Sequence, residues 1–190
     1  MKMNLFFRTF FLPALLLLLV TSCKKETAEE NLLSTTQSEL TTSANKSSVA
    51  VAASMPQNEL LLSVLRATAK FHSTAQAIKA GYEPTDHCVS VPGLGGMGFH
   101  WANPSLVDPV FDPLKPEVML YATSPGGNLK LVAVEYIVIN VGQPAPMFGD
   151  QPFDVGGSPV PVPHWSLHVW LYENNPSGIF VPFNPNISCQ

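Results

Sequence analysis

Apolar residues are densest near the start of the chain, in a run from Phe10 to Val20 that only Pro13 interrupts. Two basic residues, Lys2 and Arg8, precede this run. A membrane-spanning helix needs ~20 apolar residues, so the run is too short to cross a bilayer, whereas a basic start before a short apolar core is typical of secretion signals. The pattern therefore predicts that residues 1–22 are a signal peptide.

Small residues and a cysteine follow the apolar run. The stretch from Val20 to Cys23 resembles a lipobox, in which small residues admit the signal peptidase and the Cys thiol accepts the diacylglycerol. We therefore expect a bacterial lipoprotein anchored through Cys23; an ordinary signal peptide with a chance cysteine is the alternative. Two or three acyl chains hold a protein firmly on a membrane. No Asp follows Cys23, so the predicted location is the outer membrane, on its periplasmic or surface face.

The segment after Cys23 is polar. Eleven of residues 24–55 are Ser or Thr, and none is aromatic. Such a segment buries too little apolar surface to offset the entropy of ordering it. We expect residues 23–55 to form the lipidated cysteine and a disordered tether of roughly 30 Å, or a tether with a fraying helix in it. Residues 56–190 are then a single globular domain.

The hydrophobic pattern changes character within this domain. Asn58 to Gly81 is rich in Leu and Ala and free of Pro, which predicts one helix ended by Gly81. Beyond it Pro and Gly become frequent, and dense β-branched runs predict strands. The expected strands are Glu117–Ala122, Leu129–Ile139, Trp165–Tyr172 and Ile179–Phe183, the last two forming a hairpin. The predicted class is α+β, with one N-terminal helix packed on a small, mainly antiparallel β-sheet, sandwich or open barrel.

Residues 143–163 stand apart because they contain six Pro and three Gly. We interpret this composition as excluding regular structure. Long loops in compact domains are often functional. The segment is therefore predicted to be either the lid or rim of a binding site or a rigid surface strap.

Charge and cysteine content narrow the classes of partner. The domain has five Lys and Arg against ten Asp and Glu, a net charge of 5 − 10 = −5, which argues against nucleic acid as a partner. Apart from Cys23, the cysteines are Cys88 and Cys189. An oxidising compartment favours a disulfide between them; two metal-binding thiols are the alternative.

The glycines Gly93, Gly95 and Gly98 satisfy G-x-G-x-x-G. A dinucleotide site needs a helix that starts at these glycines, and Pro104 would end such a helix within about one turn. We interpret the glycines as a tight turn that brings His100 close to another part of the chain. No nucleophile elbow, Walker A loop, HExxH or EF-hand loop occurs, so the common hydrolase and nucleotide-binding functions have no support.

One carboxylate interrupts the apolar pattern of the predicted strand 129–139. Alternation places Leu131, Ala133, Glu135, Ile137 and Ile139 on one face and Val132, Val134, Tyr136 and Val138 on the other. Both faces are otherwise apolar, so Glu135 is expected to be buried and to need a partner. With few basic residues available, a His or a metal ion is the preferred partner; a structural pair with a His, Tyr or Trp donor is the alternative.

Histidines supply the other candidate ligands. On a strand, His164 and His168 share a face but lie roughly 13 Å apart, too far to bind one metal without a bulge. A helix would bring them together, but their aromatic and β-branched neighbours favour a strand. We expect His100, Glu135 and either His164 or His168 to form a metal site with an open position, which suits Zn, Cu or Fe. Additional candidates are Met97, toward copper, and Glu117; His72 is expected to be an ordinary helical residue.

Four stretches are similar to a family of secreted bacterial proteins and lipoproteins of no known activity. They are Val91–His100 (VPGLGGMGFH), Val134–Tyr136 (VEY), Leu167–Leu171 (LHVWL) and Asn184–Cys189. The resemblance starts at Ala80 and covers roughly 110 residues. It implies a self-contained domain and no particular activity.

These patterns lead to one leading function and three alternatives. The leading hypothesis is a lipid-tethered domain that binds a small ligand or metal ion in a pocket containing His100, Glu135 and His168. The first alternative is an enzyme that uses the same residues, with a metal or with His as general base. The others are a structural module without a site and a carbohydrate-binding module whose sugar-binding face would be formed by Trp101, Trp165 and Trp170.

Overall fold

The computed structural model describes residues 55–157 and 159–189. The predicted signal peptide, Cys23 and almost all of the tether lie outside these residues. None of the helices in the described ranges is both long and apolar enough to cross a membrane.

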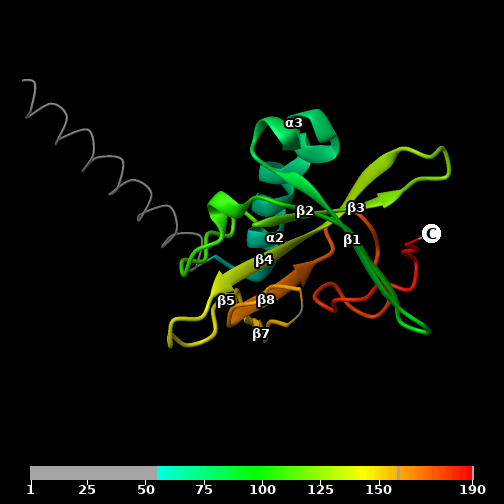
Figure 1. Cartoon of the computed structure of the whole chain (residues 1–190). Helices are drawn as coiled ribbons and strands as arrows, with labels where there is room; N and C mark the ends of the chain where they lie inside the picture. The colour runs from blue at the N-terminus through cyan, green and yellow to red at the C-terminus, as the bar shows by residue number, and fades with distance from the viewer. Residues whose placement is uncertain (1–54, 158, 190) are drawn as a thin grey trace, which may run out of the picture. The chain divides into compact units, whose positions relative to one another are not determined.

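Six strands form one open antiparallel sheet in the order β1-β2-β3-β4-β8-β7 (Figure 1). Their bounds are Glu83–Val91 (β1), Gly95–Ala102 (β2), Val118–Thr123 (β3), Leu129–Ile139 (β4), Asp154–Val155 (β7) and His164–Val169 (β8). The strands Met147–Phe148 (β5) and Gln151–Pro152 (β6) form a separate small hairpin. The α+β class and the mainly antiparallel sheet are confirmed, and the sheet closes into no barrel.

The predicted helix 58–81 is interrupted. It consists of α2 (Gln57–Thr68), a 3-10 turn η1 (Ala69–His72) and α3 (Thr74–Lys79). The hydroxyl of Tyr121 donates a hydrogen bond to the Phe71 carbonyl oxygen at 2.6 Å. In a continuous helix, this oxygen would accept from the backbone amide four residues later in the chain. This tertiary contact breaks a sequence that has good helix propensity throughout. Gly81, with φ of 93°, ends the helical region as predicted.

The helical region covers one face of the sheet (Figure 1). Leu60 and Val64 of α2 are fully buried there. They belong to the helix-side core, whose sheet residues include Met119, Tyr121, Leu131, Val134, Tyr136, Leu167 and Val169. A second cluster contains Val118, Leu120, Ala122, Val132, Ala133, Ile137, Trp170 and Ile187. The opposite face therefore has an apolar cluster of its own, to which none of the described helices contributes a residue.

A β-bulge changes the predicted alternation at the start of β4. Leu120 pairs with Ala133 and Tyr121 with Leu131, so one residue of β4 has no partner across the ladder. The shift puts Leu131 in the helix-side core and Val132 in the second cluster, the reverse of the sequence prediction. From Ala133 onward the predicted faces are correct, because no further bulge intervenes between β3 and β4.

The strands β1 and β2, which pair across the turn 92–94, were not predicted from the sequence. The glycines of β2 allow close backbone approach. A Cβ on Gly98 would lie 2.7 Å from the Tyr121 carbonyl oxygen, and one on Gly95 would lie 2.0 Å from that of Asn184. The glycine run therefore brings β2 against β3 and against the C-terminal segment, and the predicted tight turn ahead of His100 is present.

The predicted hairpin 165–183 is wrong in its second half. Residues 179–183 form no strand, although the Trp170 amide donates to the Ile179 carbonyl at 2.9 Å. The chain instead crosses to β2, where Asn184 and Gly96 form an isolated antiparallel bridge. Three prolines and the side-chain hydrogen bonds of Asn175 to the carbonyls of Val181 and Phe183 hold this segment as an irregular strap.

Residues 143–163 are more regular than predicted, because they contain β5, β6 and β7. Two aromatic anchors explain this order: Phe148 and Phe153 are buried in the helix-side core beside Tyr136. Beyond Phe153 the segment turns onto the other face and adds β7 to the edge of β8.

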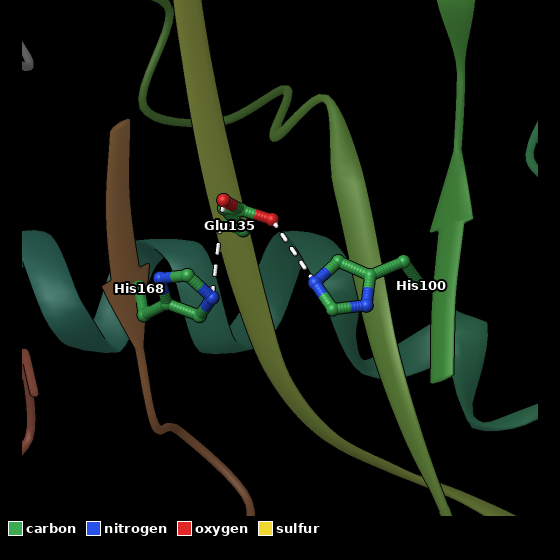
Figure 2. Close-up of side chains that lie close together, drawn as sticks. All are labelled: His100, Glu135 and His168. Atoms are coloured by element: carbon green, nitrogen blue, oxygen red, sulfur yellow. Dashed lines mark ion pairs between the residues drawn. The ribbon is translucent and has the colours of Figure 1, made fainter. Parts of the chain in front are cut away.

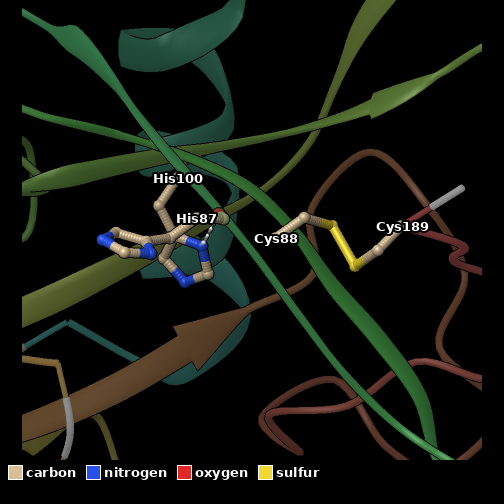
Figure 3. The surroundings of a disulfide bond; sticks show 4 residues. All are labelled: His87, Cys88, His100 and Cys189. Carbon is tan, nitrogen blue, oxygen red and sulfur yellow. Dashed lines mark hydrogen bonds between the residues drawn. A yellow bond between two sulfur atoms is a disulfide. The ribbon is translucent and has the colours of Figure 1, made fainter.

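The expected disulfide between Cys88 and Cys189 is present (Figure 3). It joins β1 to the end of the chain across 101 residues of sequence. Because β1 is an edge strand with an irregular register, the bond fixes both this edge and the C-terminal strap.

We predict that replacing both cysteines by serine lowers the free energy of unfolding by about 4–5 kcal/mol, because a crosslink of this span restricts the unfolded chain strongly. Urea titration of oxidised wild type and the double variant measures the difference. Equal unfolding midpoints would contradict the prediction.

Candidate metal centre

Glu135 lies at the middle of β4, on the face opposite the helices. It pairs directly with His168 of β8. Side chains that face each other on neighbouring antiparallel strands are close enough to interact. The sheet register therefore places the His168 ring beside the carboxylate, with His168 Nε2 3.8 Å from Glu135 Oε1.

His100 approaches the same carboxylate from the other side (Figure 2). Its strand, β2, is separated from β4 by β3, where Leu120 is its partner. The imidazole extends across β3, and its Nε2 atom lies 3.5 Å from Glu135 Oε2. Each carboxylate oxygen thus faces one ring nitrogen.

The three side chains lie close enough together to offer ligands to one metal ion. One ligand atom from each of His100, Glu135 and His168 lies within 4.8 Å of the other two. The two nitrogen–oxygen distances exceed those of good hydrogen bonds, ~2.7–3.2 Å. Ligand atoms around a cation with bonds of about 2.0–2.1 Å lie roughly 3–3.5 Å apart. Small rotations of the rings would therefore bring all three onto one ion.

The tautomer of His100 is fixed by the backbone. Its Nδ1 atom lies 3.0 Å from the His87 carbonyl oxygen, which can only accept, so Nδ1 carries the proton. In the neutral ring, Nε2 then has a free lone pair aimed at Glu135. Metal-binding histidines commonly donate their second ring nitrogen to a carbonyl in this way.

A β-bulge supplies that carbonyl. Pro84 pairs with Trp101 and Cys88 with Phe99, so three residues of β1 lie opposite His100 alone. The bulge turns the His87 carbonyl toward the ring, and the Thr85 hydroxyl donates to the His100 carbonyl at 3.0 Å. Figure 3 shows that Cys88, which immediately follows the bulge, is the disulfide residue. The orientation of His100 thus depends on a crosslinked edge.

Burial makes this arrangement unstable without a cation or proton at its centre. Burial raises the pKa of Glu135, partly offset by His100 and His164, and lowers the pKa of His168 to about 4. His168 is therefore neutral at pH 7, and its Nε2 is a buried atom without a hydrogen-bond partner. A buried carboxylate beside two imidazoles at these distances lacks a compensating positive charge, which a proton or a cation between the groups would supply.

A cavity of about 330 Å³ opens in front of the three residues. His87, His100, His164 and His168 all contribute to its wall. One side of the cavity is completed by Asp154, Val155, Gly157, Pro159 and Val160. The Pro-rich segment 143–163 therefore forms a rim of the cavity. The size matches the lower end of small-molecule sites, ~300–1,000 Å³.

Of the two candidate histidines on β8, only His168 belongs to the three-residue group, as expected for residues four positions apart on a strand. His164 lines the same cavity but lies outside the three-residue group, and its Nδ1 is 2.8 Å from the Val162 carbonyl oxygen. Met97 also lines the cavity. His72 lies elsewhere and packs edge-on against Tyr172, as expected for an ordinary helical residue. His87 was not singled out, because the bulge that gives it a role has no sequence signature.

Glu117 has a structural role. Its Oε2 atom accepts from the Ile137 amide at 3.0 Å, at a point of β4 that lies beyond the end of its pairing with β3. The side chain thus replaces a missing ladder partner. Its burial raises the pKa to about 8, so the carboxyl is largely protonated at neutral pH.

The three tryptophans form no common exposed face. Trp101 is buried in the helix-side core, and Trp165 packs against the same core. Trp170 is buried in the second cluster and donates its indole N–H to the Val181 carbonyl at 2.7 Å. These three side chains therefore do not lie together on an exposed surface, as the carbohydrate-binding alternative would require.

No family model matches the chain, and neither a curated protein nor a solved structure matches it. The resemblance to the uncharacterised secreted family thus stays a prediction from the sequence.

The role of Glu117 leads to a pH-dependent prediction. The pKa of Glu117 is about 8 in the folded state, above the ordinary 4.5. The favourable contribution of this carboxyl to the free energy of unfolding is therefore fully present below pH 4.5 and is lost as the pH rises through 8. Glu117→Gln keeps an acceptor for the Ile137 amide but cannot ionise. Its stability relative to wild type should therefore increase by at most about 1.4 kcal/mol per pH unit between about pH 5 and 8.

Urea unfolding across this pH range tests the expectation. The exposed substitution Glu59→Gln reports what the same chemical change does outside the core. A constant difference between Glu117→Gln and wild type would show that Glu117 is ionised throughout.

Proposed function

We propose that residues 56–190 form an envelope-anchored domain that binds one divalent first-row transition metal through His100 Nε2, Glu135 and His168 Nε2. The unpartnered, buried Nε2 of His168, aimed at Glu135 beside a second oriented imidazole, is the observation that carries the proposal. Two imidazoles and one carboxylate suit Zn²⁺, Fe²⁺ and Cu²⁺. Zn²⁺ is the first ion to test.

The alternative of a purely structural Glu–His pair has less support. Its two contacts are 3.5 and 3.8 Å long, outside the range of strong hydrogen bonds. A structural carboxylate in this protein looks different: Glu117 accepts a backbone amide at 3.0 Å. Each oxygen of Glu135 instead faces an imidazole nitrogen at a distance that suits two ligands of one shared ion.

Three protein ligands leave at least one coordination position for a further ligand. The cavity lies in front of the three residues, so this position faces the cavity. Such an arrangement supports binding of a second molecule to the metal, and it would equally support metal-assisted chemistry. We propose the binding function first, because binding requires only the groups already assembled.

Apo protein should bind Zn²⁺ with 1:1 stoichiometry. His100→Ala and His168→Ala should each weaken binding by more than about 100-fold, since even the loss of an orienting partner of a ligand costs ~10–100-fold. Isothermal titration calorimetry measures the affinity, and elemental analysis measures the metal content.

Matched histidine variants control for general effects on the fold. His72→Ala lies outside the cavity, and His164→Ala lies within it but outside the metal group. Both should retain Zn²⁺ with affinity close to wild type. Absence of binding in folded wild type after supply of Zn²⁺, Cu²⁺ and Fe²⁺ would overturn the proposal.

The anchor has its own test. With Cys23 as the lipidated residue, Cys23→Ala should move the protein from the membrane fraction to the soluble fraction and abolish labelling by radioactive palmitate. Lipidation of Cys23 would be contradicted by a Cys23→Ala variant that stays in the membrane fraction, or by wild-type protein that takes up no palmitate label.

A further inference from the structure

The cavity beside the proposed metal has predominantly apolar walls. Val118 and Ile137 form its floor on the sheet, and Val89, Val155 and Val160 lie around it. A cavity of about 330 Å³ admits a small molecule and excludes a folded partner. Its ligand therefore has an apolar body of limited size.

The charge of the cavity selects the ligand's polar end. None of the eighteen described residues that line it is Lys or Arg. With a divalent ion bound, the ion (+2) and the Glu135 carboxylate (−1) give a net charge of +1 on the floor of an apolar pocket. Asp154 also lines the pocket, but it is exposed on β7, where solvent screens its charge, and it does not neutralise the buried floor. A buried net charge is costly until it is compensated. A singly charged anionic group on the open coordination position provides that compensation.

The rim limits the ligand to one negative group. Asp154 lines the cavity from β7, the edge strand beside β8, and its side chain is exposed to solvent. A second carboxylate at the far end of the ligand would meet either apolar walls or the Asp154 carboxylate, and both are unfavourable. An uncharged, apolar far end meets neither penalty.

We propose that the domain binds a small amphiphilic monocarboxylate, with its carboxylate on the metal and its short alkyl or aryl group against Val89, Val118, Ile137 and Val160. This inference rests on the proposed metal site, because the metal supplies the positive charge that recognises the anion. The ligand joins and leaves by coordination alone, and no covalent bond is made or broken.

A cobalt-substituted protein allows the metal site and the carboxylate ligand to be tested separately. Co²⁺ binding in place of Zn²⁺ gives d–d absorption bands that report the metal site itself, and a change in these bands on adding a carboxylate reports the new ligand. We would titrate the Co²⁺ protein with acetate, butyrate and hexanoate. Affinity should rise about fourfold for each methylene that enters the cavity.

Matched probes isolate each feature of the ligand. Hexanol and hexylammonium carry the same chain without the anion, and adipate adds a second carboxylate; all three should bind at least about tenfold more weakly than hexanoate. Metal-free protein should not bind hexanoate. Val160→Ala removes apolar wall outside the strands, so it should weaken hexanoate by up to about tenfold and leave acetate and Co²⁺ binding unchanged.

The outcomes distinguish the two proposals. Normal Co²⁺ bands that no alkanoate perturbs, or equal affinity for acetate and hexanoate, would overturn the ligand class and leave the metal site intact. Failure to bind Co²⁺ or Zn²⁺ would overturn both. Binding of hexanoate to metal-free protein with equal strength would also contradict recognition through the metal.

Discussion

The arrangement of this domain depends on one buried carboxylate. Glu135 occupies the middle of the longest described strand, where its sequence neighbours Val134 and Tyr136 are apolar and fully buried. The cost of burying that charge is what makes the positions of His100 and His168 matter, since they are the polar groups that the sheet brings to it. One face of the same strand completes a conventional core with the helix, so fold and site are built on a single element.

The orientation of His100 on β2 depends on an irregularity in the edge strand β1. The ring of His100 is held by a carbonyl that only a bulge in β1 can offer, and the disulfide secures the strand at the next residue. Bulges near functional sites commonly re-aim a group in this manner. The glycine run has the complementary role, because it lets the chain on either side pack closely enough to keep β2 in place.

Much of this was predictable from local pattern. The bounds of β4, the burial of Glu135, the disulfide and the grouping of His100 with Glu135 follow from alternation, composition and residue chemistry. The sequence left His164 and His168 as alternatives, and the register of β4 against β8 brings His168 to Glu135. The failures share a different cause. The break at Phe71, the bulge beside Val132 and the contribution of His87 depend on contacts between segments distant in sequence. Periodicity describes one strand or helix at a time, so it cannot report how two of them meet.

The three central residues come from β2, β4 and β8, separated by more than thirty residues of chain in each case. An unfolded chain therefore presents no two of them at a fixed distance, and it has no CxxC or HExxH motif with which to capture an ion early. The pocket comes into existence only when the sheet assembles. With the proposed metal site, the ions present at the place of folding would thus determine what the domain binds.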